Sequence, residues 1–135
     1  MLKYLFYLSF LIPASLMAEN RKYVNANHIE LMINSQSYDK KNIRVYGYLV
    51  RYTSWHFYLY PYKEDDYISD ISRAIEIDGR ELNLLDCENN YVIVAGTFTR
   101  SIQNDRFVIT NLDFVKRRDP NNQMDGYVGC SYKKL

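Results

Sequence analysis

The sequence predicts a mainly β fold, a five-stranded barrel with a short N-terminal helix and a short helix between the third and fourth strands. The chain holds 14 tyrosines but only 5 glycines and 3 prolines, which is typical of an ordered, strand-rich domain. Five segments have strand patterns, and two of these carry a glycine between apolar residues. A glycine inside a strand marks a bend or a close approach of two backbones. Two such bends allow a small sheet to coil into a barrel.

The first 18 residues have the pattern of a secretory signal peptide. Lys3 is followed by an apolar stretch at residues 4–12, and a small residue, Ala18, precedes the expected cleavage site. An uncleaved anchor is the alternative, but the apolar stretch is shorter than the roughly 20 residues that a membrane-spanning helix needs. We therefore expect a signal peptide at 1–18 and one domain at 19–135. The mature protein is then exported, periplasmic or secreted, with no stable membrane anchor.

The charge of the chain indicates which partners are disfavoured, and its two cysteines predict a disulfide. Removal of Lys3 leaves 16 basic and 16 acidic residues, so bulk charge predicts no attraction to nucleic acid or to an anionic membrane. Cys87 and Cys130 are an even pair in an exported protein, which favours a disulfide that ties the C-terminal tail to the domain. A reactive or metal-binding thiol is the alternative, but a CxxC spacing and a neighbouring histidine are both missing.

The N-terminal part of the predicted domain is a helix followed by two strands. Residues 27–34 place Ile29, Met32 and Ile33 on one helical face, and a polar turn follows at 35–42. Alternating side chains then predict the first strand at 43–51 and the second at 55–60, which Pro61 ends.

The C-terminal part begins with an acidic loop at 62–73, which has room for one turn of helix. Leucines at helical spacing predict the short internal helix within 80–88, and a polar tail occupies 117–135. The remaining three strands are expected at residues 74–77, 91–98 and 106–116.

One short phrase, apolar–x–Gly–x–apolar, occurs twice, at residues 45–49 and 94–98. Five strands, a short helix between the third and fourth, and a glycine in the first and fourth resemble the OB-fold, a partly open Greek-key barrel. An immunoglobulin-like sandwich is the alternative, but it requires seven strands. The segments that carry a closer resemblance lie at 38–49, 57–61, 74–77 and 91–98.

In these segments the chain is similar to small, largely uncharacterised exported bacterial proteins with an OB-fold-like barrel. The resemblance covers residues 38–115 and implies a fold more than a chemistry. The tail from residue 117 onward departs from the family's pattern.

No signature of catalysis stands in the sequence: GxGxxG, GxxxxGK[ST], HExxH and GxSxG are all missing. His28 and His56 lie on different predicted elements without a third candidate ligand, and the acidic run at 64–66 lacks the glycine and spacing of an EF-hand. We therefore expect no metal, no cofactor and no enzymatic activity. A small hydrolase built on paired carboxylates is the lesser alternative.

The outward face of the first two strands gathers the candidate binding residues. They are Arg44, Tyr46, Tyr48, His56, Tyr58 and Tyr60. Tyrosine rings suit protein interfaces, but they also form ordinary cross-strand pairs that a helix or a tail can cover. OB barrels bind oligonucleotides or oligosaccharides on the face of strands two and three, where Glu76 and Asp78 disfavour nucleic acid here.

We therefore expect a non-enzymatic domain that recognises a protein or a cell-envelope component through this tyrosine-rich face. Binding of single-stranded nucleic acid or of an oligosaccharide is the alternative.

Overall fold

The computed structural model describes residues 22–67, 71–80, 84–101, 105–119, 121 and 126–130. The predicted signal peptide at 1–18 lies outside the described residues. Within them, no helix is long and apolar enough to cross a membrane.

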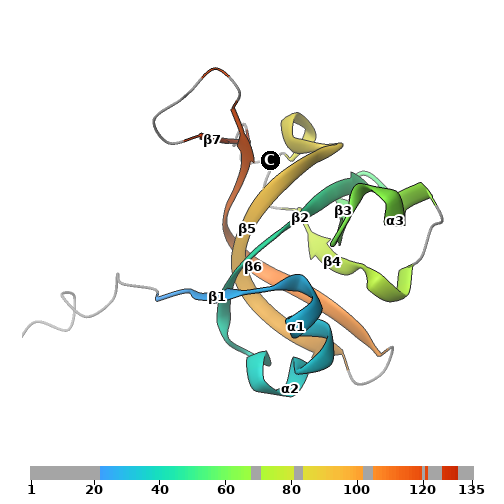
Figure 1. The fold of residues 1–135 in the computed structure, drawn as a ribbon, viewed down its shortest axis with the longest axis vertical. Coiled ribbons are helices and arrows are strands. Elements are labelled where there is room, and N and C mark those ends of the chain that lie inside the picture. Colours follow the sequence, from blue (N-terminus) through green and yellow to red (C-terminus); the bar gives the residue numbers. More distant parts are fainter. Residues whose placement is uncertain are drawn as a thin grey trace, which may run out of the picture.

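Seven strands and several short helical segments make up the described fold (Figure 1). The strands are β1 (Val24–Ala26), β2 (Asn42–Arg51), β3 (His56–Tyr60), β4 (Ile75–Asp78), β5 (Asn90–Ser101), β6 (Arg106–Arg118) and β7 (Tyr127–Gly129). The helical segments are α1 (His28–Ile33), α2 (Ser35–Tyr38), α3 (Lys63–Tyr67) and the 3-10 turns η2 (Ile71–Arg73) and η3 (Leu85–Cys87).

Five of the strands close into a barrel, as the sequence predicts. Around the barrel they follow the order β2, β3, β4, β6 and β5, and β5 pairs again with β2. The β4–β6 pair is parallel and the other four are antiparallel. Counted along the chain, this is the order one, two, three, five, four of an OB-type Greek key.

The two predicted bends are close approaches of neighbouring backbones. A Cβ added at Gly47 would lie 2.7 Å from both the Leu59 Cγ and the Tyr60 carbonyl oxygen. A Cβ at Gly96 would lie 2.7 Å from the Ile109 Cγ2, at the point where the β5–β6 register shifts. Only glycine leaves room for these crossings, so the repeated glycine phrase has a packing cause.

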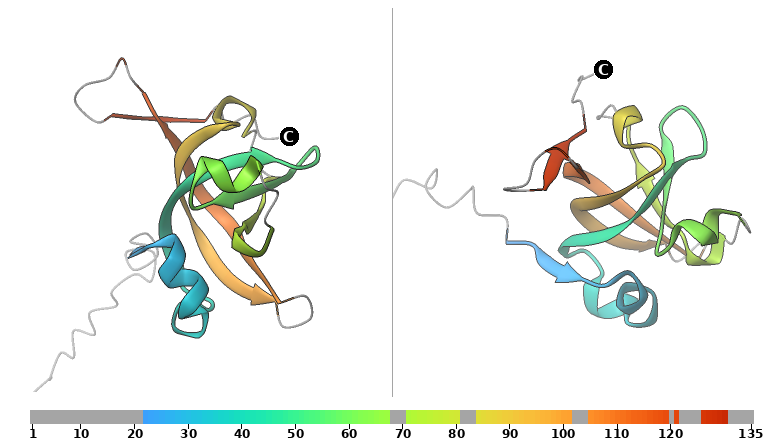
Figure 2. Two further views of the ribbon diagram at one scale, coloured as in Figure 1. Left: turned by 45° about the vertical axis from the view of Figure 1, so that its right-hand side comes forward. Right: turned by 45° about the horizontal axis from the view of Figure 1, so that its top comes forward.

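The barrel core consists of the inward side chains of alternating strand positions, together with Leu31 from α1 and Leu84 beside η3. The α1–α2 segment lies at one end of the barrel and η3 at the other (Figures 1 and 2). On α1, however, Ile29 and Ile33, which share the predicted apolar face, are exposed by 46% and 74%. The helix instead buries Leu31 and His28.

Two short strands that the sequence does not predict pair with strands of the barrel. β1 lies parallel to β2, and β7 lies antiparallel to β6. The predicted turn at 35–42 begins as the short helix α2, and the internal helix expected within 80–88 is a single 3-10 turn, with residues 81–83 outside the described part of the chain.

The described part of the C-terminal tail is held against the barrel. Cys87 and Cys130 form the predicted disulfide, with their Cα atoms 5.6 Å apart. The Cys130 amide also donates to the Val115 carbonyl at 3.1 Å. The disulfide therefore fastens β7 and the residue after it to η3.

A candidate binding groove beside an open tyrosine pair

The structure divides the predicted tyrosine face into a covered part and an open part. Tyr48, Tyr58 and Tyr60 are buried. Tyr58 and Tyr60 form a separate apolar cluster with Ala74, the residue that follows η2, and α3 packs against β3 (Figure 1). Among the described residues, the cover is therefore formed by α3 and by the residues around η2, which belong to the acidic loop.

The other predicted site residues occupy different places. The Nδ1 of His56 lies 3.0 Å from a carboxylate oxygen of Glu76 across the β3–β4 pair. On the outward face of β2, Arg44 donates from its Nε to the Asn25 side-chain oxygen at 2.7 Å. Among the predicted tyrosines, Tyr46 stays open, with 49% of its surface exposed. The six predicted residues therefore do not form one continuous site.

Tyr46 has a partner that the sequence analysis did not single out. Its ring stacks on that of Tyr91, with centroids 5.5 Å apart and planes 5° from parallel, and Tyr48 meets the same Tyr91 edge-on at 5.2 Å. Barrel closure brings Tyr91 there, because β5 pairs with β2 in the register Tyr48↔Tyr91. We call Tyr46 and Tyr91 the tyrosine pair.

The tyrosine pair borders an open groove of about 740 Å³. One wall is the continuous segment 25–30, from β1 into α1, and the turn after β3 at Pro61 and Tyr62 also lines the groove. We call this the α1 groove. Its lining residues are Asn25, Ala26, Asn27, His28, Ile29, Glu30, Tyr46, Pro61, Tyr62 and Tyr91.

Hydrogen bonds within the protein hold the walls of the α1 groove. The Asn27 side-chain oxygen accepts from the Ile29 amide at 2.8 Å and caps α1, as is usual for asparagine at a helix start. The Glu30 carboxylate accepts from the Tyr38 hydroxyl at 2.6 Å, and the Tyr91 hydroxyl oxygen accepts from the Lys63 amide at 3.1 Å. Hydrogen bonds within the chain therefore fix the shape of the walls, which favours recognition by shape.

His28 fastens the α1 wall to the neighbouring segment. The residue is buried, with 4% of its surface exposed, and its Nε2 lies 2.7 Å from the carbonyl oxygen of Arg73 at the end of η2. A carbonyl oxygen only accepts, so Nε2 carries the proton. The Arg73 guanidinium in turn pairs with the buried Asp65 carboxylate of α3 at 3.2 Å. Together these three residues form the junction between α1, α3 and η2, which we call the His28 junction.

Burial and nearby side chains change the pKa of the exposed Tyr46 hydroxyl. Partial burial raises the pKa of Tyr46, and Tyr127 and Tyr91 raise it further, whereas Arg118 acts in the opposite direction. Tyr46 is therefore neutral at ordinary pH. Arg118 of β6 and Tyr127 of β7 are register partners in the β6–β7 pair.

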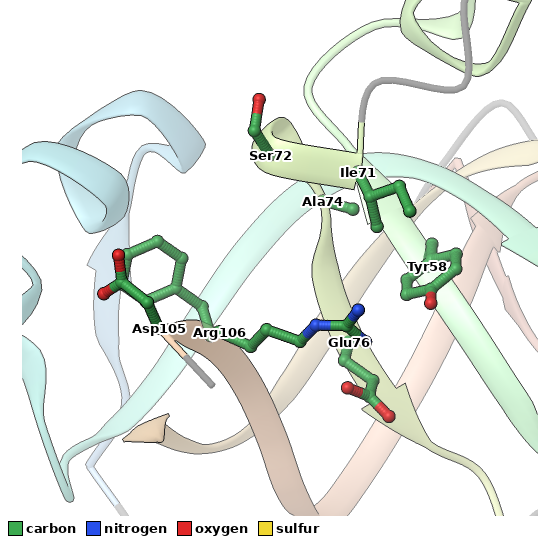
Figure 3. Close-up of a pocket in the computed structure, with 8 residues that line it drawn as sticks. Tyr58, Ile71, Ser72, Ala74, Glu76, Asp105 and Arg106 are labelled. Carbon is green, nitrogen blue, oxygen red and sulfur yellow. The ribbon is translucent and has the colours of Figure 1, made fainter. Parts of the chain in front are cut away.

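A second, smaller pocket of about 190 Å³ lies on the β3–β4 side of the barrel (Figure 3). Tyr58 and Ala74 line it, Glu76 stands on β4, and the Arg106 side chain reaches toward Glu76. This is the face that OB barrels commonly use for ligands. Here Ile71 and Ser72 of η2 border it.

The described groove lining contains no serine, cysteine or lysine nucleophile and a single carboxylate, Glu30. No group of three or more metal-ligating side chains occurs in the part of the chain that the structure describes. No protein-family model matches the chain, and no curated protein sequence matches it.

Proposed function

We propose that this protein is an exported, non-enzymatic domain that binds a protein partner through the α1 groove and its tyrosine pair. The disulfide between Cys87 and Cys130 is compatible with an oxidising compartment outside the cytoplasm. The observation that carries the proposal is the open Tyr46–Tyr91 stack beside a preformed groove.

Exposed apolar side chains around the groove support a protein partner over a sugar or a nucleic acid. Ile29, Ile33 and Tyr62 are exposed by 46%, 74% and 53%, and all three belong to the groove walls or to α1. Large exposed apolar surfaces rimmed by polar groups mark protein interaction sites. Aromatic residues are likewise enriched in such interfaces.

The β3–β4 face offers less support for the nucleic-acid or oligosaccharide alternative. Tyr58 and Tyr60, which would stack on a base or a sugar there, are buried under the α3–η2 segment. Glu76 and Asp78 stand on the same sheet, and Asp78 is held ionised because its contact with Arg80 lowers its pKa. A nucleic-acid groove needs the opposite charge.

Quantitative affinity capture from an extract of the cells that make the protein tests this proposal. The bait is the purified disulfide-bonded domain, compared with its Tyr46→Ala variant. We expect the variant to lose most of the captured partner, since truncating an aromatic anchor at an interface commonly costs about 2 kcal/mol or more.

Tyr52→Ala is the matched control. Tyr52 is 68% exposed and contacts Tyr58, at the end of β2 away from the Tyr48↔Tyr91 register. Capture should survive in this variant. Equal capture by the wild type and by Tyr46→Ala, with both proteins folded by circular dichroism, would contradict the proposal. Binding of a defined oligonucleotide or oligosaccharide that Tyr46→Ala abolishes would establish the alternative function at the same groove.

A further inference from the structure

The His28 junction connects the wall of the α1 groove to the rest of the fold. Residues 25–30 form one wall, and His28 is the member of this segment whose ring reaches the Arg73 carbonyl. The Leu31 amide donates to the Asn27 carbonyl at 3.0 Å, so the first turn of α1 begins at the same place. Release of His28 would therefore loosen the wall and the start of the helix together.

The junction accepts a neutral imidazole but not an imidazolium. In the neutral ring the Nε2 proton is donated to Arg73, while the Nδ1 is buried and has no hydrogen-bond partner among the described residues. A second proton on Nδ1 would be a buried donor without an acceptor among the described residues, on a residue with 4% of its surface exposed. The neutral ring leaves only an unused acceptor there, which costs less.

The charged groups around His28 act in opposing directions. The Asp65 carboxylate on α3 favours the protonated ring, but it is already paired with the Arg73 guanidinium from η2. Glu30, on α1 itself, accepts from Tyr38, and the groove adds the hydroxyl groups of Tyr62 and Tyr91. Burial outweighs these groups, so the pKa of His28 lies below its ordinary value of 6.5.

We propose that His28 is a pH-sensitive latch that holds the α1 groove in its binding shape at neutral pH and releases the β1–α1 wall when it is protonated. This inference rests on the proposed function for its biological meaning, since it regulates the same groove. Its physical content, a pH-dependent opening of the wall, is measurable without any partner. Opening of the wall is coupled to the uptake of one proton: His28 binds one H⁺ when the wall is open and none when it is closed.

The opening is measured by amide hydrogen exchange of the disulfide-bonded protein at several pH values between 7.5 and 4.5, corrected for the intrinsic rate. Leu31 on α1 reports the wall, and Val94 in the buried part of β5 reports the whole barrel. The opening constant at Leu31 should increase below about pH 6.5, by up to a factor of ten per pH unit for one coupled proton. Leu31 should also exchange faster than Val94 throughout.

His28→Gln and His56→Gln separate the latch from general acid effects. Glutamine at position 28 retains an N–H donor for the Arg73 carbonyl but does not titrate, so the pH dependence at Leu31 should vanish. His56→Gln should retain it, because His56 faces Glu76 on another part of the barrel. Three results would each overturn the latch: exchange at Leu31 that does not change with pH in the wild type, the same pH dependence in His28→Gln, or equal exchange rates at Leu31 and Val94.

An NMR titration of the His28 ring in the wild-type protein provides a test that needs no variant. The latch requires the ring to titrate below pH 6.5 as the Nε2 tautomer, and a pKa at or above this value would overturn it. Neither measurement involves a partner. Loss of capture in the Tyr46→Ala experiment and failure of the latch are therefore separate results.

Discussion

Substitution of Gly47 by alanine should destabilise the barrel more than the same substitution at Gly79. The new Cβ would lie 2.7 Å from the Tyr60 carbonyl oxygen and 2.7 Å from the Leu59 Cγ. Ordinary contacts of a Cβ begin near 3.4 Å, so both atoms must move. The carbonyl belongs to the neighbouring strand β3, whose ladder with β2 fixes its position. We therefore expect a loss at the upper end of overpacking costs, about 3 kcal/mol.

Gly79→Ala is the matched control for this prediction. Its Cβ would meet side-chain carbons of Leu84 and Phe57 at 3.1 Å, with no backbone atom among its nearest neighbours. These side chains can shift by a few tenths of an ångström, so the expected loss is about 1 kcal/mol or less. Urea unfolding followed by far-ultraviolet circular dichroism measures both. Our explanation of the glycine phrase fails if Gly47→Ala costs no more than Gly79→Ala.

Three further changes have expected outcomes in the same unfolding assay. Replacing both Cys87 and Cys130 by alanine should lower the free energy of unfolding by up to about 4 kcal/mol, the chain-entropy limit for this loop. An unchanged unfolding midpoint would mean that the disulfide does not constrain the tail. Tyr58→Ala should lower the free energy of unfolding by about 3 kcal/mol because the residue is buried, whereas Tyr46→Ala should lower it clearly less. Similar losses in the two variants would refute the division into covered and open tyrosines. Below pH 6.5 the free energy of unfolding should decrease by up to about 1.4 kcal/mol per pH unit, because His28 binds a proton more readily in the unfolded chain than in its buried position. This pH-dependent component should be missing in His28→Gln.

The barrel was predictable because its strands carry strong local signals. The alternation from residue 43 to 51 identifies the inward positions of β2 correctly, and the glycines at 47 and 96 mark the two close approaches. The strands β1 and β7 were not predicted, since each has three residues. Such short strands carry no periodicity of their own and form only because β2 and β6 offer free hydrogen-bonding edges.

The candidate site was less predictable, since burial of an outward face depends on tertiary contacts. Tyr46 is exposed on the outward face, but Tyr58, which the sequence places on the same face, is buried beside Ala74 at the end of the acidic loop. In this loop the buried Asp65 carboxylate pairs with the Arg73 guanidinium, a contact that the charge pattern alone does not reveal. Tyr91 was missed because its strand is apolar on both sides, and only closure of β5 against β2 shows which of its residues stand beside Tyr46.

Site-specific photo-crosslinking tests the role of the α1 groove most directly. A benzoyl-phenylalanine photoprobe replaces Tyr46 in one protein and Tyr52 in another, and both proteins are irradiated in the cells that produce them. A discrete adduct with one protein at position 46, absent at the more exposed position 52, is the predicted result. Equal adducts at both positions, or none at 46 while the protein is folded and its disulfide formed, would contradict the proposal that this groove recognises a protein partner.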